Sequence, residues 1–172
     1  PKIITSSIEH TAVLDTCTNA VKKTSGLVRI PVSVEGDVVL EDLEQLLQQH
    51  PSLVSIMTVN NETGLCLPIQ EIARLAKSYG IPIHTDAVQA CGKIPIDLRN
   101  LPVDLMSLSG HKMCGPKGTG ILFIREGTEL KPMIFGGGQE KGIRPGTQDV
   151  VGAVGISKAI ELSVAEQPVE YV

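Results

Sequence analysis

The sequence LVSIMTV at residues 53–59 is a continuous apolar run interrupted only by one serine and one threonine. Runs of this kind are typical of a strand that is buried on both faces of a parallel sheet. Residues 69–79 then place apolar side chains at helical spacing and end at Gly80. A second short strand is expected at residues 82–86. Strand, helix and strand in this order predict a parallel sheet with its crossover helix.

The same alternation extends in both directions along the chain. Strands are expected at residues 2–5 and 27–32 with a helix at 10–23 between them, and a second helix at 40–50 is closed by Pro51. Further strands are expected at 104–109 and 119–125, followed by a glycine loop at 136–138 and a helix at 150–164. The predicted fold class is therefore α/β, a mostly parallel sheet covered by helices on both faces, built as one domain over residues 1–172.

Composition excludes several classes of protein. The formal net charge is −4, with two Phe, two Tyr and no Trp, which argues against a nucleic-acid platform. No apolar run reaches the 18 residues that a membrane-spanning helix needs. The four cysteines form no C-x-x-C pair, so a zinc ribbon or redox dithiol is not expected. Reduced thiols and a cytoplasmic location are predicted.

Polar side chains gather where three of the predicted strands end. Asn61 follows the strand at 53–59, Asp86 ends the strand at 82–86, and Lys112 follows the strand at 104–108. Near them in sequence are four further polar residues: Asn60, Gln89, Ser109 and His111. Because ligands of open α/β sheets bind outside the carboxyl ends of the strands, these residues are expected to share one site.

A carboxylate and a lysine at one sheet edge are most simply an ordinary ion pair. However, Lys112 lies in SGHKMCGPKGTG, residues 109–120, whose four glycines allow a ligand to approach the backbone. Pyridoxal 5′-phosphate (PLP) chemistry needs a lysine amine for an imine, a carboxylate beside the pyridine nitrogen and donors for the phosphate. The order G-x-x-x-x-G-K-[ST] of a nucleotide-binding loop is absent. His84 and Asp86 lack a third metal ligand, which favours a hydrogen-bonded core histidine.

Six segments together resemble the cysteine desulfurases, within the class V aminotransferase fold type. They are IITSSIEH at 3–10, VSIMTVNNETG at 54–64, HTDAVQ at 84–89, DLMSLSGHK at 104–112, GPKG at 115–118 and GGGQEKGIRPGT at 136–147. The resemblance covers nearly the whole chain, and the ordered set is specific where GPKG alone is weak.

The resemblance implies four residues around the pyridine ring. His10 matches the histidine that stacks on the ring and relays protons, and Asn61 matches an asparagine near the ring hydroxyl and the substrate carboxylate. Asp86 matches the partner of the pyridinium nitrogen, and Gln89 the donor to the ring hydroxyl.

It also implies a lysine and a set of phosphate ligands. Lys112 matches the Schiff-base lysine, while Ser109 and His111 match ligands of the phosphate. Thr147 matches a threonine that reaches the phosphate of the neighbouring subunit, which implies a homodimer with shared active sites.

The implied activity is PLP-dependent conversion of L-cysteine to L-alanine, with the sulfur carried as a persulfide on a protein cysteine and passed to an acceptor protein, as in iron–sulfur cluster assembly. Two alternatives stay open: a selenocysteine lyase of the same fold, and a non-catalytic dimerisation or scaffold remnant. No membrane or nucleic-acid partner is expected.

Family members also carry an N-terminal glycine-rich segment and a C-terminal small domain with the nucleophilic cysteine and a substrate-binding arginine. Neither is visible here, so we expect a central piece of a longer enzyme that is inactive alone. Residues 150–172 are expected to form the helix leading toward the small domain. Cys17, Cys66, Cys91 and Cys114 are interpreted as packing or loop residues, with Cys114 the nearest to Lys112.

Overall fold

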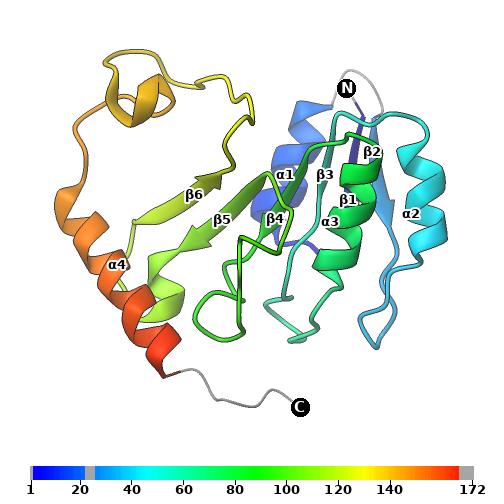
Figure 1. The fold of residues 1–172 in the computed structure, drawn as a ribbon, viewed down its shortest axis with the longest axis horizontal. Coiled ribbons are helices and arrows are strands. Elements are labelled where there is room, and N and C mark those ends of the chain that lie inside the picture. The colour runs from blue at the N-terminus through cyan, green and yellow to red at the C-terminus, as the bar shows by residue number, and fades with distance from the viewer. Residues whose placement is uncertain (1, 22–25, 167–172) are drawn as a thin grey trace.

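The computed structural model describes residues 2–21 and 26–166. Its elements, in chain order, are β1 (Ile3–Ser6), α1 (Thr11–Ala20), β2 (Leu27–Ile30), α2 (Leu40–Leu47), β3 (Leu53–Ser55), α3 (Ile69–Ser78), β4 (Ile83–Asp86), β5 (Leu105–Ser109), the 3₁₀ helix η1 (Gly110–Met113), β6 (Gly120–Ile124), the 3₁₀ helix η2 (Gln139–Gly142) and α4 (Val150–Ala165). Figure 1 shows them arranged around one sheet.

The six strands lie in the order β2-β1-β3-β4-β5-β6. The first five run parallel to their neighbours, and β6 pairs antiparallel with β5. The chain moves from β1 outward to β2, returns past β1 to β3, and then proceeds across the sheet. The prediction of a mostly parallel α/β sheet is confirmed.

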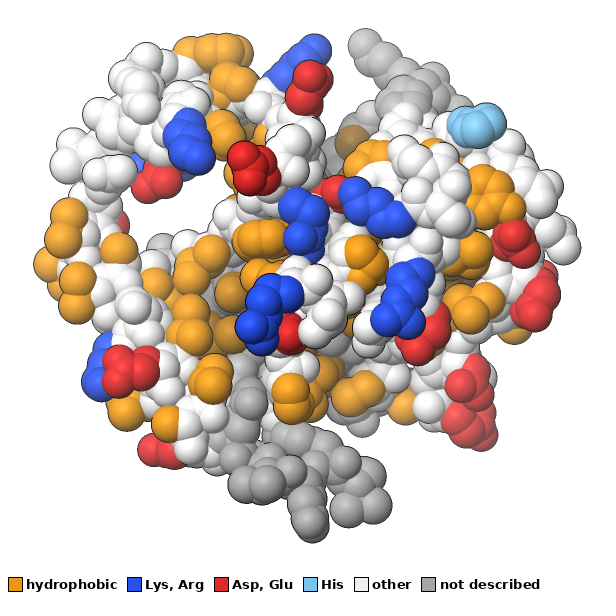
Figure 2. All heavy atoms as spheres, viewed as in Figure 1, with side chains coloured by type: hydrophobic (Ala, Val, Ile, Leu, Met, Phe, Trp, Pro, Cys, Tyr) orange, Lys and Arg blue, Asp and Glu red, His pale blue; other side chains and the backbone are white. Residues whose placement is uncertain are grey.

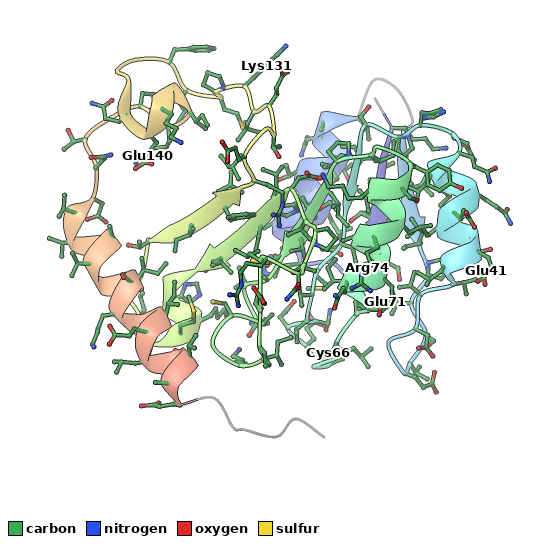
Figure 3. The ribbon with its side chains drawn as sticks, in the orientation of Figure 1. Glu41, Cys66, Glu71, Arg74, Lys131 and Glu140 are labelled. Carbon is green, nitrogen blue, oxygen red and sulfur yellow. The ribbon has the colours of Figure 1, made fainter. Side chains whose placement is uncertain are left out.

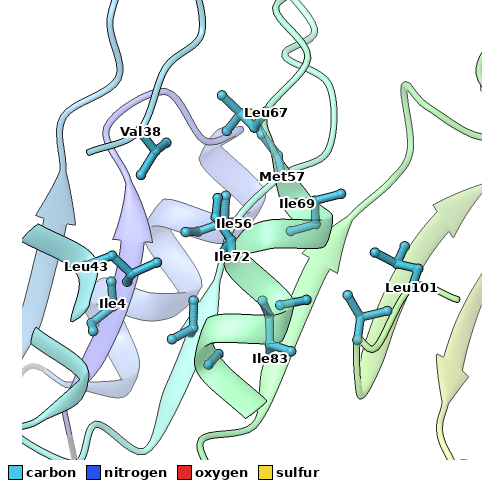
Figure 4. Close-up of a cluster of buried hydrophobic side chains, with 14 of the residues drawn as sticks. Ile4, Val38, Leu43, Ile56, Met57, Leu67, Ile69, Ile72, Ile83 and Leu101 are labelled. Carbon is cyan, nitrogen blue, oxygen red and sulfur yellow. The ribbon is translucent and has the colours of Figure 1, made fainter. Parts of the chain in front are cut away.

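Helices cover both faces of this sheet. Cys17 and Val21, on and just after α1, pack against Ile3 on one face. Helices α2 and α3 cover the opposite face, where Leu43 and Ile72 pack with Ile4 in the largest buried cluster. Figure 1 shows α1 behind the sheet and α2 and α3 in front of it, and Figure 4 shows the cluster beneath α2 and α3. Side chains that alternate along a strand thus find an apolar partner on either side.

Most elements lie within two residues of the sequence-based expectation, and three differ by more. The strand expected at 53–59 is regular only to Ser55, although Ile56 and Thr58 still donate backbone hydrogen bonds to His84 and Asp86 at 3.1 and 2.9 Å. Beyond that point the chain turns back on itself, with Val59 bridged to Cys66, so a regular ladder cannot continue.

The other two differences concern helix ends. Helix α2 stops at Leu47 rather than residue 50, because His50, which precedes Pro51, adopts a φ of 49° outside the helical region. Helix α1 begins after His10, which is its N-cap, and ends at Ala20. Lys22 and Lys23, which were expected to continue α1, lie outside the described residues, as do residues 167–172 of the predicted C-terminal helix.

Helix α4 packs on η1, where Ile156 and Ala159 form a small cluster with Met113. Among the residues that the structure describes, no helix combines the length and apolarity required to cross a bilayer.

Candidate functional site

The carboxyl ends of β1, β3, β4 and β5 all lie at one edge of the sheet, because these strands are parallel. The register of β4 and β5 pairs Asp86 with Ser107, two residues before Ser109. This edge faces the lower side of Figure 1, and Figure 3 places Cys66, on the loop after β3, on the same side. The sheet therefore brings the ends of four strands together where the sequence predicted a site.

Asp86 closes β4 and is half-buried. Its Oδ1 accepts a hydrogen bond of 2.9 Å from the backbone N–H of Val88, which fixes the carboxylate at the start of the turn. The turn continues with Ala87 and Ala90 buried beneath it. Asp86 is thus an acceptor held on a rigid element rather than on a mobile loop.

A chain of side-chain hydrogen bonds runs across the sheet beside Asp86. The His84 ring joins Ser55 through Nδ1 and Ser107 through Nε2, each at 2.8 Å. Burial lowers the pKa of His84, and the charge of Asp86 opposes that effect only partly. A neutral imidazole that uses both nitrogens is a satisfied core histidine, as the sequence predicted. Within the described residues no group of three His, Cys, Asp or Glu side chains is placed to hold a metal ion.

The loop after β5 presents Lys112 and His111 to solvent while burying Met113 below them. Ser109 Oγ and His111 Nδ1 lie 2.9 Å apart, so a hydroxyl and an imidazole form one cluster at the strand end. Lys112 has neither an ion-pair partner nor a side-chain acceptor within residues 2–21 and 26–166. The lysine amine is therefore not engaged in the simple ion pair with Asp86 that was the plainest expectation.

Two glycines allow this loop to close. The N–H of Gly115 donates to the carbonyl oxygen of Gly110 at 2.9 Å. A Cβ at Gly115 would lie only 2.9 Å from that same oxygen and 3.0 Å from Cβ of Ala159 on α4. Cys114 makes the turn in the left-handed region with a φ of 58°. Glycine at 115 thus allows α4 to press directly on the lysine loop.

His10 and Asn61 reach the same edge from the other side. His10 caps α1, with Nδ1 accepting from the N–H of Ala12 at 3.1 Å, so a neutral His10 carries its proton on the exposed Nε2. Asn60 is buried and holds the turn after β3: its amide donates to the carbonyl of Ile8 at 2.7 Å, and its Oδ1 accepts from the N–H of Thr63 at 2.8 Å. Asn61, by contrast, is exposed and available to a ligand.

Gln89 and Thr147 are placed differently from the rest. Gln89 is half-buried on the turn after Asp86, and its Oε1 accepts a hydrogen bond from Lys93. Thr147 is exposed on the segment between η2 and α4, which passes around the β6 side of the sheet (Figure 1). In Figure 3 Lys131 and Glu140, which belong to the stretch before it, lie on the side of the molecule opposite Cys66. The other seven candidates thus follow or end strands whose carboxyl ends share this edge, whereas Thr147 lies on the segment between η2 and α4.

The residue that sequence reasoning missed is Glu9. Its side chain is only 6% exposed, and Oε1 accepts hydrogen bonds of 2.7 Å from both Ser6 Oγ and the N–H of Met57. Its Oε2 is buried and has no hydrogen-bond partner in the described structure. Burial raises the pKa of Glu9 to about 7, against the effect of its hydrogen bonds and with a further contribution from the charge of Asp86. The sequence carries no local signal for this burial, because Glu9 is covered by the segment that contains Met57, 48 residues further along the chain.

All four cysteines are free thiols. Cys17 is buried beside Ile3, and Cys91 packs against the cluster of Met113 and Ile156, in agreement with their predicted packing roles. Burial raises the pKa of both thiols, and the charge of Glu9 adds to the effect at Cys17. Cys66 and Cys114 are exposed.

The structure is that of an α/β protein whose parallel strands end in a lysine loop, a carboxylate and a helix-capping histidine. The family model for class V aminotransferases matches residues 1–171. The chain belongs to the class V aminotransferase family.

The chain is also similar to individual curated proteins of this family. The chain is 48% identical over 168 residues to the cysteine desulfurase IscS of Dictyoglomus turgidum, covering 98% of this chain and 43% of the relative. It is 45% identical over 159 residues to the cysteine desulfurase NifS of Azotobacter vinelandii, covering 92% of this chain and 40% of the relative. This chain thus spans less than half the length of the curated relatives it matches.

Solved structures agree with the family assignment. A NifS-like protein superposes with a TM-score of 0.91 at 47% identity, covering 96% of this chain and 46% of that one. The structure described as SspA in complex with cysteine gives a TM-score of 0.89 at 39% identity, covering 98% and 48%.

Proposed function

We propose that this chain is the cofactor-carrying part of a PLP-dependent cysteine desulfurase, which converts L-cysteine to L-alanine and passes sulfur to a protein cysteine as a persulfide. The observation that carries the proposal is the sheet edge, where Lys112, Asp86 and the Ser109–His111 pair follow two neighbouring strands. Membership of the class V aminotransferase family and 45–48% identity to proteins named cysteine desulfurase support it independently.

The residues present fit PLP. A half-buried carboxylate faces this edge at Asp86, an amine without a partner among the described residues is available at Lys112, and a hydroxyl and an imidazole stand together at Ser109 and His111. These are the acid, the amine and the phosphate donors that the cofactor requires. When bound, PLP supplies an electron sink for negative charge that develops at the α-carbon of an amino-acid substrate.

Each residue has a task that follows from its position. Asp86 would accept a hydrogen bond from the ring nitrogen of the bound cofactor, and Gln89 would donate to the ring hydroxyl. Lys112 would hold the cofactor through its amine, and the same amine could move the α-proton of the substrate. Asn61 would bind the ring hydroxyl and the substrate carboxylate, and His10 would stack on the ring with its Nε2 placed to carry a proton.

Thr147 belongs to a different part of the proposal. We propose that the protein is a homodimer in which Thr147 donates to the phosphate held by the neighbouring subunit. The separation of Thr147 from the other seven residues supports this, because an exposed threonine on an outlying segment needs a second chain to act.

Apolar side chains beside Thr147 also support the dimer. Met133, Ile134 and Phe135 are 94%, 64% and 84% exposed, and Val150 and Val151 at the start of α4 are 66% and 85% exposed. Figure 2 shows hydrophobic side chains gathered over α4 and over the segment that precedes it. Large apolar side chains exposed in such groups are typical of an association site. Phe135→Asp should convert the dimer to a monomer in sedimentation experiments.

The acceptor of the sulfur is proposed to be a second protein that presents a thiol. We also propose a cytoplasmic location, supported by the four free thiols, which are typical of reducing compartments. A relative from Drosophila melanogaster is named mitochondrial, another compartment in which this kind of protein is found.

The decisive experiment incubates the whole protein containing this chain with PLP and L-cysteine, and measures alanine and protein-bound persulfide. Equimolar alanine and sulfur would support the proposal. Turnover of selenocysteine without cysteine would assign a selenocysteine lyase instead. Absence of a visible absorbance band for bound PLP would identify a non-catalytic scaffold.

A further inference from the structure

Glu9 lies between two segments that both carry site residues. It follows β1 and precedes His10, while its Oε1 accepts the N–H of Met57 on the segment that continues from β3 to Asn61. Asn60 makes a second tie between the same segments through the carbonyl of Ile8. The Glu9 carboxyl group thus helps to connect the segment that carries His10 to the segment that carries Asn61, and so to fix the relative positions of these two residues.

The two oxygens of this carboxyl group have unequal surroundings. Oε1 accepts two hydrogen bonds of 2.7 Å, from Ser6 Oγ and the N–H of Met57. Oε2 is buried without a partner among the described residues, in a side chain that is 6% exposed. A negative charge on an unsolvated oxygen is costly, whereas a proton placed on Oε2 removes that charge and leaves both bonds to Oε1 intact.

The titratable groups around Glu9 provide no positive charge that would favour its ionised form. Asp86 on β4 raises the pKa of Glu9, to about 7 together with the larger effect of burial. On α1 the charge of Glu9 and the Cys17 thiol affect one another, and a thiol supplies no positive charge at neutral pH. His84, the titratable group next to Asp86 on β4, is kept neutral by burial. No cation among these groups offsets a second carboxylate, and two neighbouring carboxylates do not both ionise readily.

We propose that Glu9 is a positioning residue of the candidate site: it ties the His10 segment to the Asn61 segment as a neutral acid protonated on Oε2, so that Asp86 alone carries negative charge toward the ligand. The part concerning the ligand rests on the function proposed above. The protonation of Glu9 rests only on the contacts of this chain. The ring nitrogen of a bound cofactor would then face a single negative charge, that of the Asp86 carboxylate.

The first test needs neither cofactor nor activity. Infrared difference spectra of the whole protein without PLP, between pH 6 and pH 8, should show loss of a protonated carboxyl band, because carboxylates with ordinary pKa values are already ionised at pH 6. Glu9→Gln should abolish that band, and Glu62→Gln, at an exposed carboxylate on the same edge, should leave it unchanged. An unaltered band in the Glu9→Gln variant, or no band in the parent chain, would overturn the proposal whatever the protein catalyses.

The second test separates a positioning role from a merely structural one. Glutamine keeps the Oε1 acceptor and places an uncharged NH₂ where the protonated Oε2 stands. At pH 6, where wild-type Glu9 is protonated, Glu9→Gln in the whole protein should therefore bind PLP within about 3-fold of wild type, whereas Glu9→Ala should bind about 10-fold more weakly, since the tie to Met57 is lost.

Equal weakening by the glutamine and alanine variants would contradict the neutral-acid role. If Glu9→Ala fails to fold, Glu9→Asp, whose shorter side chain does not reach Met57 N–H, should show the weaker binding. A protein that fails to desulfurate cysteine but retains the infrared band would refute the proposed function and leave the assignment of the Glu9 proton standing.

Discussion

The two ends of the sheet contrast in how their polar groups are used. At the amino end, Asp104 is buried and bonds Lys77 through Oδ1 and the N–H of Ile83, at 2.9 Å, through Oδ2. Arg125 at the same end donates to the carbonyl oxygens of Leu98, Leu101 and Val103 at 2.7–2.9 Å. At the carboxyl end, Lys112 and the Oε2 of Glu9 have no partner within the described residues.

This difference suggests that the amino end of the sheet serves the stability of the fold, while the carboxyl end serves its function. Polar groups at the amino end satisfy one another, and their removal should affect folding. At the carboxyl end Lys112 and Asn61 are exposed and have no side-chain partner among the described residues, which is expected where a ligand completes the set. Variants at the two ends should therefore fail in different assays.

The largest effect is expected for Lys112→Ala in the whole protein. Desulfurase turnover and the visible absorbance of bound PLP should both disappear, because the amine proposed to hold the cofactor is removed. The melting temperature of the cofactor-free protein should change by no more than about a degree, since an exposed lysine without a partner among the described residues adds little to folding. Lys117→Ala, an exposed lysine on the same loop, is the matched control; normal turnover by Lys112→Ala would show that the lysine is misassigned.

Asp86→Ala should retain the absorbance of bound PLP but lower kcat by roughly 10²–10³-fold, because the ring nitrogen loses the carboxylate that keeps it protonated. Steady-state rates with L-cysteine measure this effect. Glu126→Ala, an exposed carboxylate at the amino end, should match wild type. A kcat near the wild-type value for the Asp86 variant would remove Asp86 from the site.

Asp104→Ala tests the amino end. It leaves the N–H of Ile83 buried without an acceptor and Lys77 without its counterion, which should lower the free energy of unfolding by roughly 2–3 kcal/mol. Lys77 is itself 40% exposed, so part of its loss is recovered from water. Urea unfolding measures the change. Residual desulfurase activity per folded molecule should stay near wild type. A loss of activity without a loss of stability would contradict the purely structural role assigned to the amino end of the sheet.

The smallest effect is expected from His84. Its folded pKa is lowered by burial, so the unfolded chain binds more protons near pH 6 and stability should fall as pH drops below about 6.5. Glu9 acts with the opposite sign, since a raised carboxyl pKa makes stability fall as pH rises toward 7. Thermal unfolding of Glu9→Gln against pH isolates the histidine, and adding His84→Asn should flatten that curve.

The sequence alone determined the fold class and the list of strand-end residues. Apolar periodicity placed the strands and helices because burial on two faces imposes a pattern on each segment, as in residues 53–59 and 69–79. Parallel strands share one carboxyl edge, so the grouping of Asp86 with Lys112 at that edge followed without coordinates.

Only the tertiary structure decided which of these polar groups have partners. Ser55, His84 and Ser107 come from three different strands, and only the sheet register joins them in one chain of hydrogen bonds. The burial of Glu9 likewise depends on Met57, 48 residues further along the chain. A carboxyl group's solvation is set by neighbours that are distant in sequence, so no local pattern reveals that burial raises the pKa of this glutamate.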